Sequence, residues 1–164
     1  MRRIDNRAGA MPRYGTGRGM GFTLIEVMIV LVVLGILTAV VYPSYERQMV
    51  KTRRAEAQFA LFETMQRQEQ YRALHHSYAA FSAASGNAGD AGFRWWIGAR
   101  ASVSAYELDA YACPDQDIVQ CVVVRARPGT DRVNPRFRDR ECGELTFSST
   151  GEHSASGASG RCWP

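Results

Sequence analysis

Cysteine is scarce in this 164-residue sequence, and none occurs in the first 112 residues. The four cysteines are separated by seven, twenty and nineteen residues, so no Cys-x-x-Cys pair exists. This spacing argues against a structural zinc site. An even number of cysteines in one part of the chain favours two disulfides, formed in an oxidising compartment. The four residues are Cys113, Cys121, Cys142 and Cys162.

The sequence also lacks the motifs of common catalytic and nucleotide-binding sites. It has no phosphate-binding Gly-x-x-x-x-Gly-Lys loop, no Gly-x-Gly-x-x-Gly fingerprint, no His-Glu-x-x-His pair and no Gly-x-Ser-x-Gly elbow. His75 and His76 fall at the end of a predicted helix, where they suit the helix dipole better than a metal site. We therefore expect no enzyme activity, no metal and no cofactor.

Most of the chain has no net charge, because the excess of +4 lies entirely before residue 22. Residues 1–21 contain five arginines and one aspartate, whereas the rest of the chain contains 15 basic and 15 acidic side chains. Positive charge beside an apolar run marks the cytoplasmic side of a membrane segment. The distribution predicts a cytoplasmic leader and not a basic mature protein.

One long apolar run follows this leader. Residues 22–41 hold a single charged side chain, Glu26. Twenty helical residues that rise about 1.5 Å each span the roughly 30 Å of bilayer hydrocarbon. An ionised carboxylate within such a span costs at least about 2.5–3.5 kcal/mol, so it is usually retained where it finds a partner. We predict one membrane-spanning helix in which Glu26 has a function.

The start of the run resembles a known processing site. A secretory signal places its cleavage site after the apolar region, whereas the small residue Gly21 precedes it here. The stretch Gly21-Phe22-Thr23-Leu24-Ile25-Glu26 is similar to that of type IV prepilins and of the pseudopilins of type II secretion. The resemblance implies that a prepilin peptidase cuts between Gly21 and Phe22 and N-methylates Phe22. The resulting leader, residues 1–21, is long for this class, which leaves Met1 and Met11 as alternative starts.

The resemblance also implies how such a protein assembles. Glu26 can reach its own N-terminal amine or that of a neighbouring subunit, and in this family the acidic residue has the assembly role. Gly35 and Pro43 match positions where pilin helices bend, and both residue types weaken a helix. The expected partners are major and minor pilin subunits, prepilin peptidase, the inner-membrane assembly platform and, before assembly, membrane lipid. We expect a single-pass inner-membrane protein with a periplasmic head, which later reaches the pilus at the cell surface.

The expected fold class is α+β, with a type IV pilin-like helix packed on three or four antiparallel strands. The helix continues from the membrane segment, residues 22–45, into a head of residues 46–164. An apolar stripe at helical spacing faces the head and is covered by bulky residues 93–97 after a glycine-rich loop at 79–92. The stripe comprises Ala55, Phe59, Phe62 and Met65. Strands are predicted at residues 103–112, 118–126 and 144–148.

The cysteines are expected to close two loops of this head. Cys113 and Cys121 flank the turn between the first two strands, which favours a bridge across that hairpin. The end of the chain, from Cys142-Gly143-Glu144-Leu145-Thr146-Phe147 to Cys162-Trp163, is similar to the tail of PilE-type pilins. In those pilins the last two cysteines form a disulfide, which implies a Cys142–Cys162 bridge that closes loop 142–162.

The predicted function is that of a type IV pilus subunit, and the tail favours a minor pilin that joins or primes the filament and supports adhesion or twitching motility. One alternative is a type II secretion pseudopilin. Another is a DNA-uptake (competence) pilin that binds DNA through residues 132–140, where Phe137 lies among Arg132, Arg136, Arg138 and Arg140. Asp131, Asp139 and Glu141 dilute this cluster, so the sequence by itself favours a solvated loop.

Overall fold

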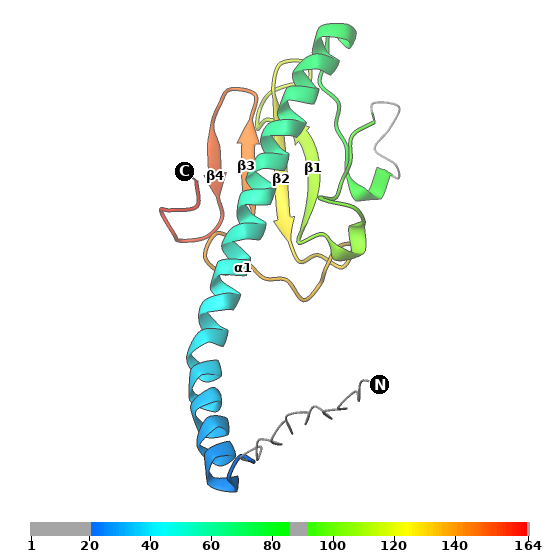
Figure 1. Cartoon of the computed structure of the whole chain (residues 1–164). Helices are drawn as coiled ribbons and strands as arrows, with labels where there is room; N and C mark the ends of the chain where they lie inside the picture. The colour runs from blue at the N-terminus through cyan, green and yellow to red at the C-terminus, as the bar shows by residue number, and fades with distance from the viewer. Residues whose placement is uncertain (1–20, 86–91, 164) are drawn as a thin grey trace, which may run out of the picture. The chain divides into compact units, whose positions relative to one another are not determined.

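The computed structural model describes residues 21–85 and 92–163 (Figure 1). The predicted leader therefore lies outside the described residues apart from Gly21, as do residues 86–91 of the predicted glycine-rich loop. The longest element is helix α1, Leu24–His75. Thr23 caps its start, because its Oγ1 and carbonyl oxygen accept hydrogen bonds from the Glu26 N–H at 3.3 and 3.1 Å. His76, with a φ of 58°, ends the helix in the left-handed conformation.

The chain divides into two compact units between Val41 and Tyr42, and α1 contributes to both. Within the described residues, α1 is the helix long and apolar enough to cross a membrane, with a mean hydropathy of 2.9 in its most apolar window. Its helical conformation continues through Gly35 and Pro43. Thr38 Oγ1 donates to the carbonyl oxygens of Leu34 and Gly35 at 2.9 and 3.0 Å, an arrangement that often bends helices. The kink itself stays a prediction.

The second unit contains a four-stranded antiparallel sheet in the order β1-β2-β3-β4. The strands are β1 (Tyr106–Ala112), β2 (Val122–Pro128), β3 (Leu145–Ser148) and β4 (His153–Ala155). One face of the sheet packs on α1 (Figure 1), and the shared core includes Leu61, Leu108 and Val124. The structure thus confirms the expected α+β arrangement of one long helix on an antiparallel sheet.

Strand β4 was not predicted, since residues 153–155 belong to a stretch poor in apolar side chains. It pairs with β3 in the register Thr146↔Ser154, and the two hydroxyl groups lie 2.7 Å apart. Trp163 Nε1 donates to the Ser154 carbonyl oxygen at 2.9 Å. The strand is therefore held by hydrogen bonds from both sides and not by a hydrophobic pattern.

The predicted apolar stripe on α1 is wrong for two of its four residues, because Ala55 is exposed and Phe59 is 71% exposed. Phe62 is 42% exposed, but its ring contacts those of Phe147 on β3 and Trp163, at 4.7 and 6.1 Å between centroids. The face that packs on the sheet instead contains the small Ala57 and Ala60, the apolar Leu61 and Met65, and the polar Arg54 and Gln68. Small residues allow the helix close to the sheet, and Gln68 is satisfied because its amide bonds both the N–H and the carbonyl oxygen of Ala79.

The connection between α1 and β1 extends the sheet with short bridges. Phe81 pairs with Ala110, and Trp96 pairs with Glu107. Phe93 stacks on Phe81 at 5.2 Å, and Trp95 and Ile97 pack against the same core, as expected. Trp96 does not share that position, because neighbouring residues of an extended segment point to opposite faces.

Both disulfides are present in the structure, between Cys113 and Cys121 and between Cys142 and Cys162. The first closes the β1–β2 hairpin, where the Cys113 N–H also donates to the Cys121 carbonyl oxygen at 3.2 Å. The second ties the start of β3 to the end of the chain, and both of its cysteines belong to the main core. Together the two disulfides fix the β1–β2 turn and the C-terminal segment, which have few apolar side chains of their own to pack.

Candidate functional site

Four exposed arginines lie on the connection between β2 and β3, which we call the basic loop (residues 129–141). They are Arg132, Arg136, Arg138 and Arg140. The loop begins at Gly129, whose φ is 57° and whose N–H donates to the Ala105 carbonyl oxygen at 3.1 Å. A Cβ atom at this position would collide with the Phe137 backbone oxygen, so a glycine is required where the loop folds back on itself.

The four arginines do not have the same surroundings. Arg138 Nη1 donates to the carbonyl oxygens of Pro135, Phe137 and Gly129 at 2.6, 2.7 and 3.1 Å, so it closes the loop from within. Arg132 Nη1 donates to the Ala83 carbonyl oxygen at 2.9 Å. In the described part of the chain, the guanidinium groups of Arg136 and Arg140 have no hydrogen bond and no ion pair. These two cations are available to an anionic partner.

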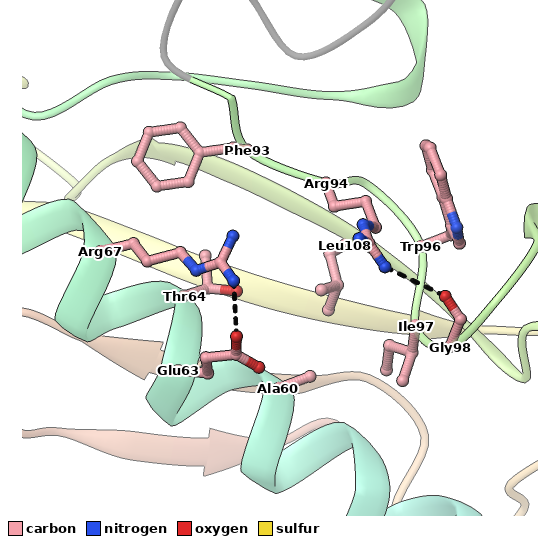
Figure 2. A pocket seen from close by; sticks show the side chains of 10 residues that line it. All are labelled: Ala60, Glu63, Thr64, Arg67, Phe93, Arg94, Trp96, Ile97, Gly98 and Leu108. Carbon is pink, nitrogen blue, oxygen red and sulfur yellow. Dashed lines mark hydrogen bonds and ion pairs between the residues drawn. The ribbon is translucent and has the colours of Figure 1, made fainter.

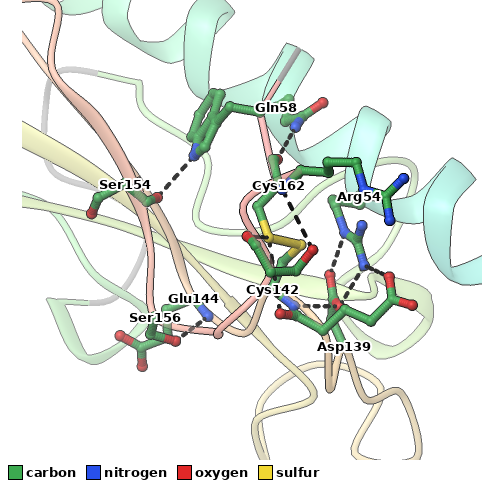
Figure 3. The surroundings of a disulfide bond; sticks show 12 residues. Arg54, Gln58, Asp139, Cys142, Glu144, Ser154, Ser156 and Cys162 are labelled. Atoms are coloured by element: carbon green, nitrogen blue, oxygen red, sulfur yellow. Dashed lines mark hydrogen bonds and ion pairs between the residues drawn. A yellow bond between two sulfur atoms is a disulfide. The ribbon is translucent and has the colours of Figure 1, made fainter.

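Asp139 is turned away from the exposed face of the loop and is buried (Figure 3). Its Oδ2 and Oδ1 accept hydrogen bonds from Arg54 Nε and Nη2, both at 2.8 Å. The Tyr106 hydroxyl donates to Oδ2 at 2.7 Å, and the Cys142 N–H donates to Oδ1 at 3.1 Å. The carboxylate thus joins α1, β1 and the disulfide loop at one point.

The charges of this cluster stabilise one another. Burial acts to raise the pKa of Asp139, but the hydrogen bonds from Arg54, Tyr106 and the Cys142 N–H outweigh it and hold the pKa below its ordinary value. The hydrogen bond to Asp139 raises the pKa of Arg54, and burial together with the same carboxylate raises the pKa of Tyr106. All three groups therefore keep one protonation state around neutral pH.

Glu141, the second acid beside the arginines, also contacts the helix. Arg54 Nη2 lies 3.0 Å from its Oε2. Two of the three carboxylates that appeared to dilute the arginine cluster are therefore bound by a cation from α1, and Asp131 is the one left exposed without such a contact. Of the three acids, only Asp139 is removed from the outer face by burial, whereas the Glu141 side chain is still 57% exposed.

Two hollows lie beside this loop, and both border Glu141. One, of about 330 Å³, is lined by α1 residues 46, 47 and 50 and by loop residues 138–141. The other, of about 450 Å³, lies between α1 and the end of the chain, where it includes Lys51 and Arg161. Both cations are exposed, and neither has an ion pair among the described residues, so they extend the cationic surface beyond the loop.

A third hollow, of about 180 Å³, lies between α1 and residues 93–98 (Figure 2). Its arginines are already engaged, because Arg67 pairs with Glu63 at 2.7 Å and Arg94 Nη1 donates to the Gly98 carbonyl oxygen at 3.2 Å. Figure 2 shows the Trp96 ring on the side of its segment away from α1. This hollow is small and offers no free cation among the residues that line it.

The other residues predicted from the sequence lie apart from this surface. Gly21 and Phe22 are exposed at the start of the described chain, and Glu26 is exposed in the first turn of α1. The proposed cleavage, methylation and assembly roles of these residues remain predictions. Residues 21–85 and 92–163 hold no group of three or more His, Cys, Asp or Glu side chains placed to bind a metal ion.

Sequence reasoning missed Arg54 and Tyr106. The sequence pattern gave Arg54 no role, yet this residue is only 7% exposed. Its spacing from Ala57 and Leu61, three and seven residues later, places it on the buried face and was the available signal. A buried arginine needs a partner that compensates its charge, and Asp139 fulfils that role.

Two family models match the chain. The model described as the prokaryotic N-terminal methylation motif matches residues 21–42, and the model described as "Type IV minor pilin ComP, DNA uptake sequence receptor" matches residues 43–146. Among solved structures, the chain is similar to a type IV pilin from Shewanella oneidensis, with 18% identity and a TM-score of 0.42 over 70% of this chain and 98% of that one. No curated protein sequence matches it.

The two family matches adjoin one another and confirm the resemblance to type IV pilins that the processing motif indicated. An apolar N-terminal helix with this methylation motif is typical of a membrane-anchored pilus protein. The second match alone covers more than half of the 164 residues. The chain therefore belongs to the family of type IV minor pilins described as ComP, DNA uptake sequence receptor.

Proposed function

We propose that this chain is a minor pilin that binds double-stranded DNA during DNA uptake, and that the basic loop contacts the phosphate backbone. The description of its family names a DNA uptake sequence receptor. The structural observation that carries the proposal is that Arg54 binds the buried Asp139 and also contacts Glu141, while Arg136 and Arg140 stay exposed and unpaired among the described residues. This observation favours the competence alternative over the solvated loop that composition favours.

The proposed contact is electrostatic. Each phosphate that a protein neutralises on duplex DNA releases counterions and contributes about 0.9 to the slope of log affinity against log salt. Arg136 and Arg140 are exposed and unpaired among the described residues, so they are the proposed phosphate contacts. Phe137 is half-buried and its ring packs on Tyr106 at 5.2 Å, so the proposed contact does not depend on base stacking by this residue.

Phosphate contacts position a protein on DNA but do not read its sequence. The loop therefore supplies affinity and orientation, and a preference for one DNA sequence requires additional contacts with base edges. Lys51 and Arg161 lie beside the loop and are proposed as further backbone contacts. A selection from random duplexes with the full chain would show whether a preferred sequence exists.

We also propose the assembly route that the first 26 residues imply. Prepilin peptidase cleaves after Gly21 and methylates Phe22. Before assembly, the processed protein remains in the inner membrane with its head in the periplasm. Its apolar helix enters the pilus core, where Glu26 pairs with the amine of a neighbouring subunit. As a pilus component it would also take part in adhesion or twitching motility. Mass spectrometry of protein from sheared filaments tests this route, and an intact leader on filament-bound protein would contradict it.

The DNA proposal is tested by fluorescence polarisation with the full chain in detergent and a labelled duplex, over a series of salt concentrations. Arg136→Gln/Arg140→Gln should lower the salt slope by about 1.8, which corresponds to two phosphate contacts. The matched control is Arg53→Gln/Arg67→Gln, which also removes two positive charges but from ion pairs on α1. The control should retain the original slope. An unmodified chain that does not bind DNA would refute the proposal.

A further inference from the structure

We infer that the Arg54–Asp139 pair is a positioning device for the DNA contact, an inference that rests on the proposed function. The pair is buried and does not face a ligand. Its proposed task is to fix the basic loop so that Arg136 and Arg140 are presented together to the phosphate backbone. Arg54 and Asp139 are thus positioning residues, whereas Arg136 and Arg140 are contacting residues.

The loop is held by two of its own side chains. The exposed Arg138 bonds three carbonyl oxygens of the loop, one of them that of Gly129 at the start of the loop. At its end, Asp139 receives four hydrogen bonds from Arg54, Tyr106 and the Cys142 N–H (Figure 3). Arg138 and Asp139 thus hold the loop, whereas the guanidinium groups of Arg136 and Arg140 have no partner among the described residues.

Such anchoring matters for an electrostatic contact. Long arginine side chains on a mobile loop must be ordered when DNA binds, and this ordering lowers the affinity. A loop that is fixed beforehand avoids that loss and keeps its cations at a constant separation. Asp139 therefore supports an anion-binding surface even though its own charge has the same sign as DNA.

This contrast makes the inference testable, because two views predict opposite effects of one substitution. Asp139→Asn removes a negative charge, so long-range electrostatics alone predicts tighter DNA binding. The positioning role predicts weaker binding, since asparagine is neutral and cannot replace the bidentate ion pair with Arg54. Asp131→Asn is the matched control, because Asp131 is an exposed acid of the same loop without a contact to Arg54.

The experiment measures binding of a labelled duplex by the full chain in detergent, with near-UV circular dichroism as the check of folding. At a slope of about 0.9 per phosphate, two contacts contribute about 30-fold to the affinity between about 1 M and 0.15 M salt. Asp139→Asn should lose most of this 30-fold contribution to the affinity for DNA, and its slope of log affinity against log salt should fall by about 1.8. Asp131→Asn should bind as tightly as the unmodified chain or slightly more tightly.

Tyr106→Phe provides a second variant that retains the charge of Asp139 and the ring contact with Phe137. It should reduce the affinity by less than Asp139→Asn does, and it decides the question if Asp139→Asn does not fold. If folded Asp139→Asn binds DNA as tightly as the unmodified chain or more tightly, the inference is overturned but the proposed function is not. The same result for Tyr106→Phe has this meaning if Asp139→Asn does not fold. Absence of binding by the unmodified chain would overturn the proposed function and the inference with it.

Discussion

Replacement of Arg54 by methionine should destabilise the head strongly. Arg54 supplies two of the four hydrogen bonds to Asp139, whose side chain has no exposed surface. Methionine fills a similar volume but leaves the carboxylate buried without a cation. Loss of one partner from a buried ion pair costs about 3–5 kcal/mol. Since domains are typically stable by about 5–15 kcal/mol, this is a large part of the free energy of unfolding.

A double-mutant cycle isolates the interaction from other effects of the substitution. Asp139→Asn also destabilises the head, because asparagine offers Arg54 one neutral acceptor oxygen and Glu141 is then its only carboxylate partner. The double variant Arg54→Met/Asp139→Asn has neither buried charge, so its loss of stability should be smaller than the sum of the two single losses. We expect a coupling energy of about 1–3 kcal/mol.

The effect of Arg54→Met should depend on pH in a defined direction. In the unmodified protein the pKa of Asp139 is lowered, so the carboxylate contributes stability above its ordinary pKa of 3.8 and this contribution is lost as the pH falls through the lower folded value. In the variant, the lowering by Arg54 is lost, so the pKa of Asp139 should be higher than in the unmodified protein and the folded head should take up a proton at a higher pH. The difference in stability is therefore largest at neutral pH and narrows toward about pH 4.

Urea unfolding of the full chain in detergent, followed by the near-UV circular dichroism of its tryptophans, provides the assay. It should be repeated at several pH values with all four members of the cycle. A loss of less than about 1 kcal/mol for Arg54→Met, independent of pH, would refute the argument that Asp139 depends on this cation. Additive losses in the cycle would show that the two residues do not interact.

Three further predictions follow from the core, the disulfide and the membrane helix. Leu61→Ala, at a side chain with no exposed surface, should lower the free energy of unfolding by about 2–5 kcal/mol, whereas Val119→Ala at a 47% exposed side chain should change it by less than about 0.5 kcal/mol. Both are measured by urea unfolding. Loss of the Cys142–Cys162 bridge, which closes a loop of 20 residues, should lower it by about 3 kcal/mol, as measured with a double serine variant. Glu26→Ala should remain inserted in the membrane and cleaved but be poorly recovered from sheared filaments. Normal recovery of that variant would contradict the assembly role.

The long helix, the antiparallel sheet and the hairpin position of Cys113 and Cys121 could be predicted because their signals are local. Twenty apolar residues, turn residues between β-branched runs and the motif at Gly21 can each be read without knowledge of the rest of the fold. The same kind of local pattern did not identify the buried face of α1 after Tyr42. Phe59 looks like a core residue by its chemistry, yet the sheet packs on another face of the helix.

The candidate site depends on contacts between distant parts of the chain, so its organisation could not be predicted. Arg54 and Asp139 are separated by 85 residues, and no local pattern relates them. In the sequence, Asp139 only reduced the net charge of its loop. Its inward orientation, and with it the basic character of the outer face, follows from burial and can be seen only in the folded structure.

DNA uptake by cells that carry Arg136→Gln/Arg140→Gln in place of the unmodified chain tests the central claim most directly. Uptake of fluorescent DNA should fall strongly, while filaments still contain the variant in normal amounts. Cells with the control Arg53→Gln/Arg67→Gln should take up DNA normally. Unchanged uptake by cells whose pili contain Arg136→Gln/Arg140→Gln would contradict a DNA-binding role for the basic loop.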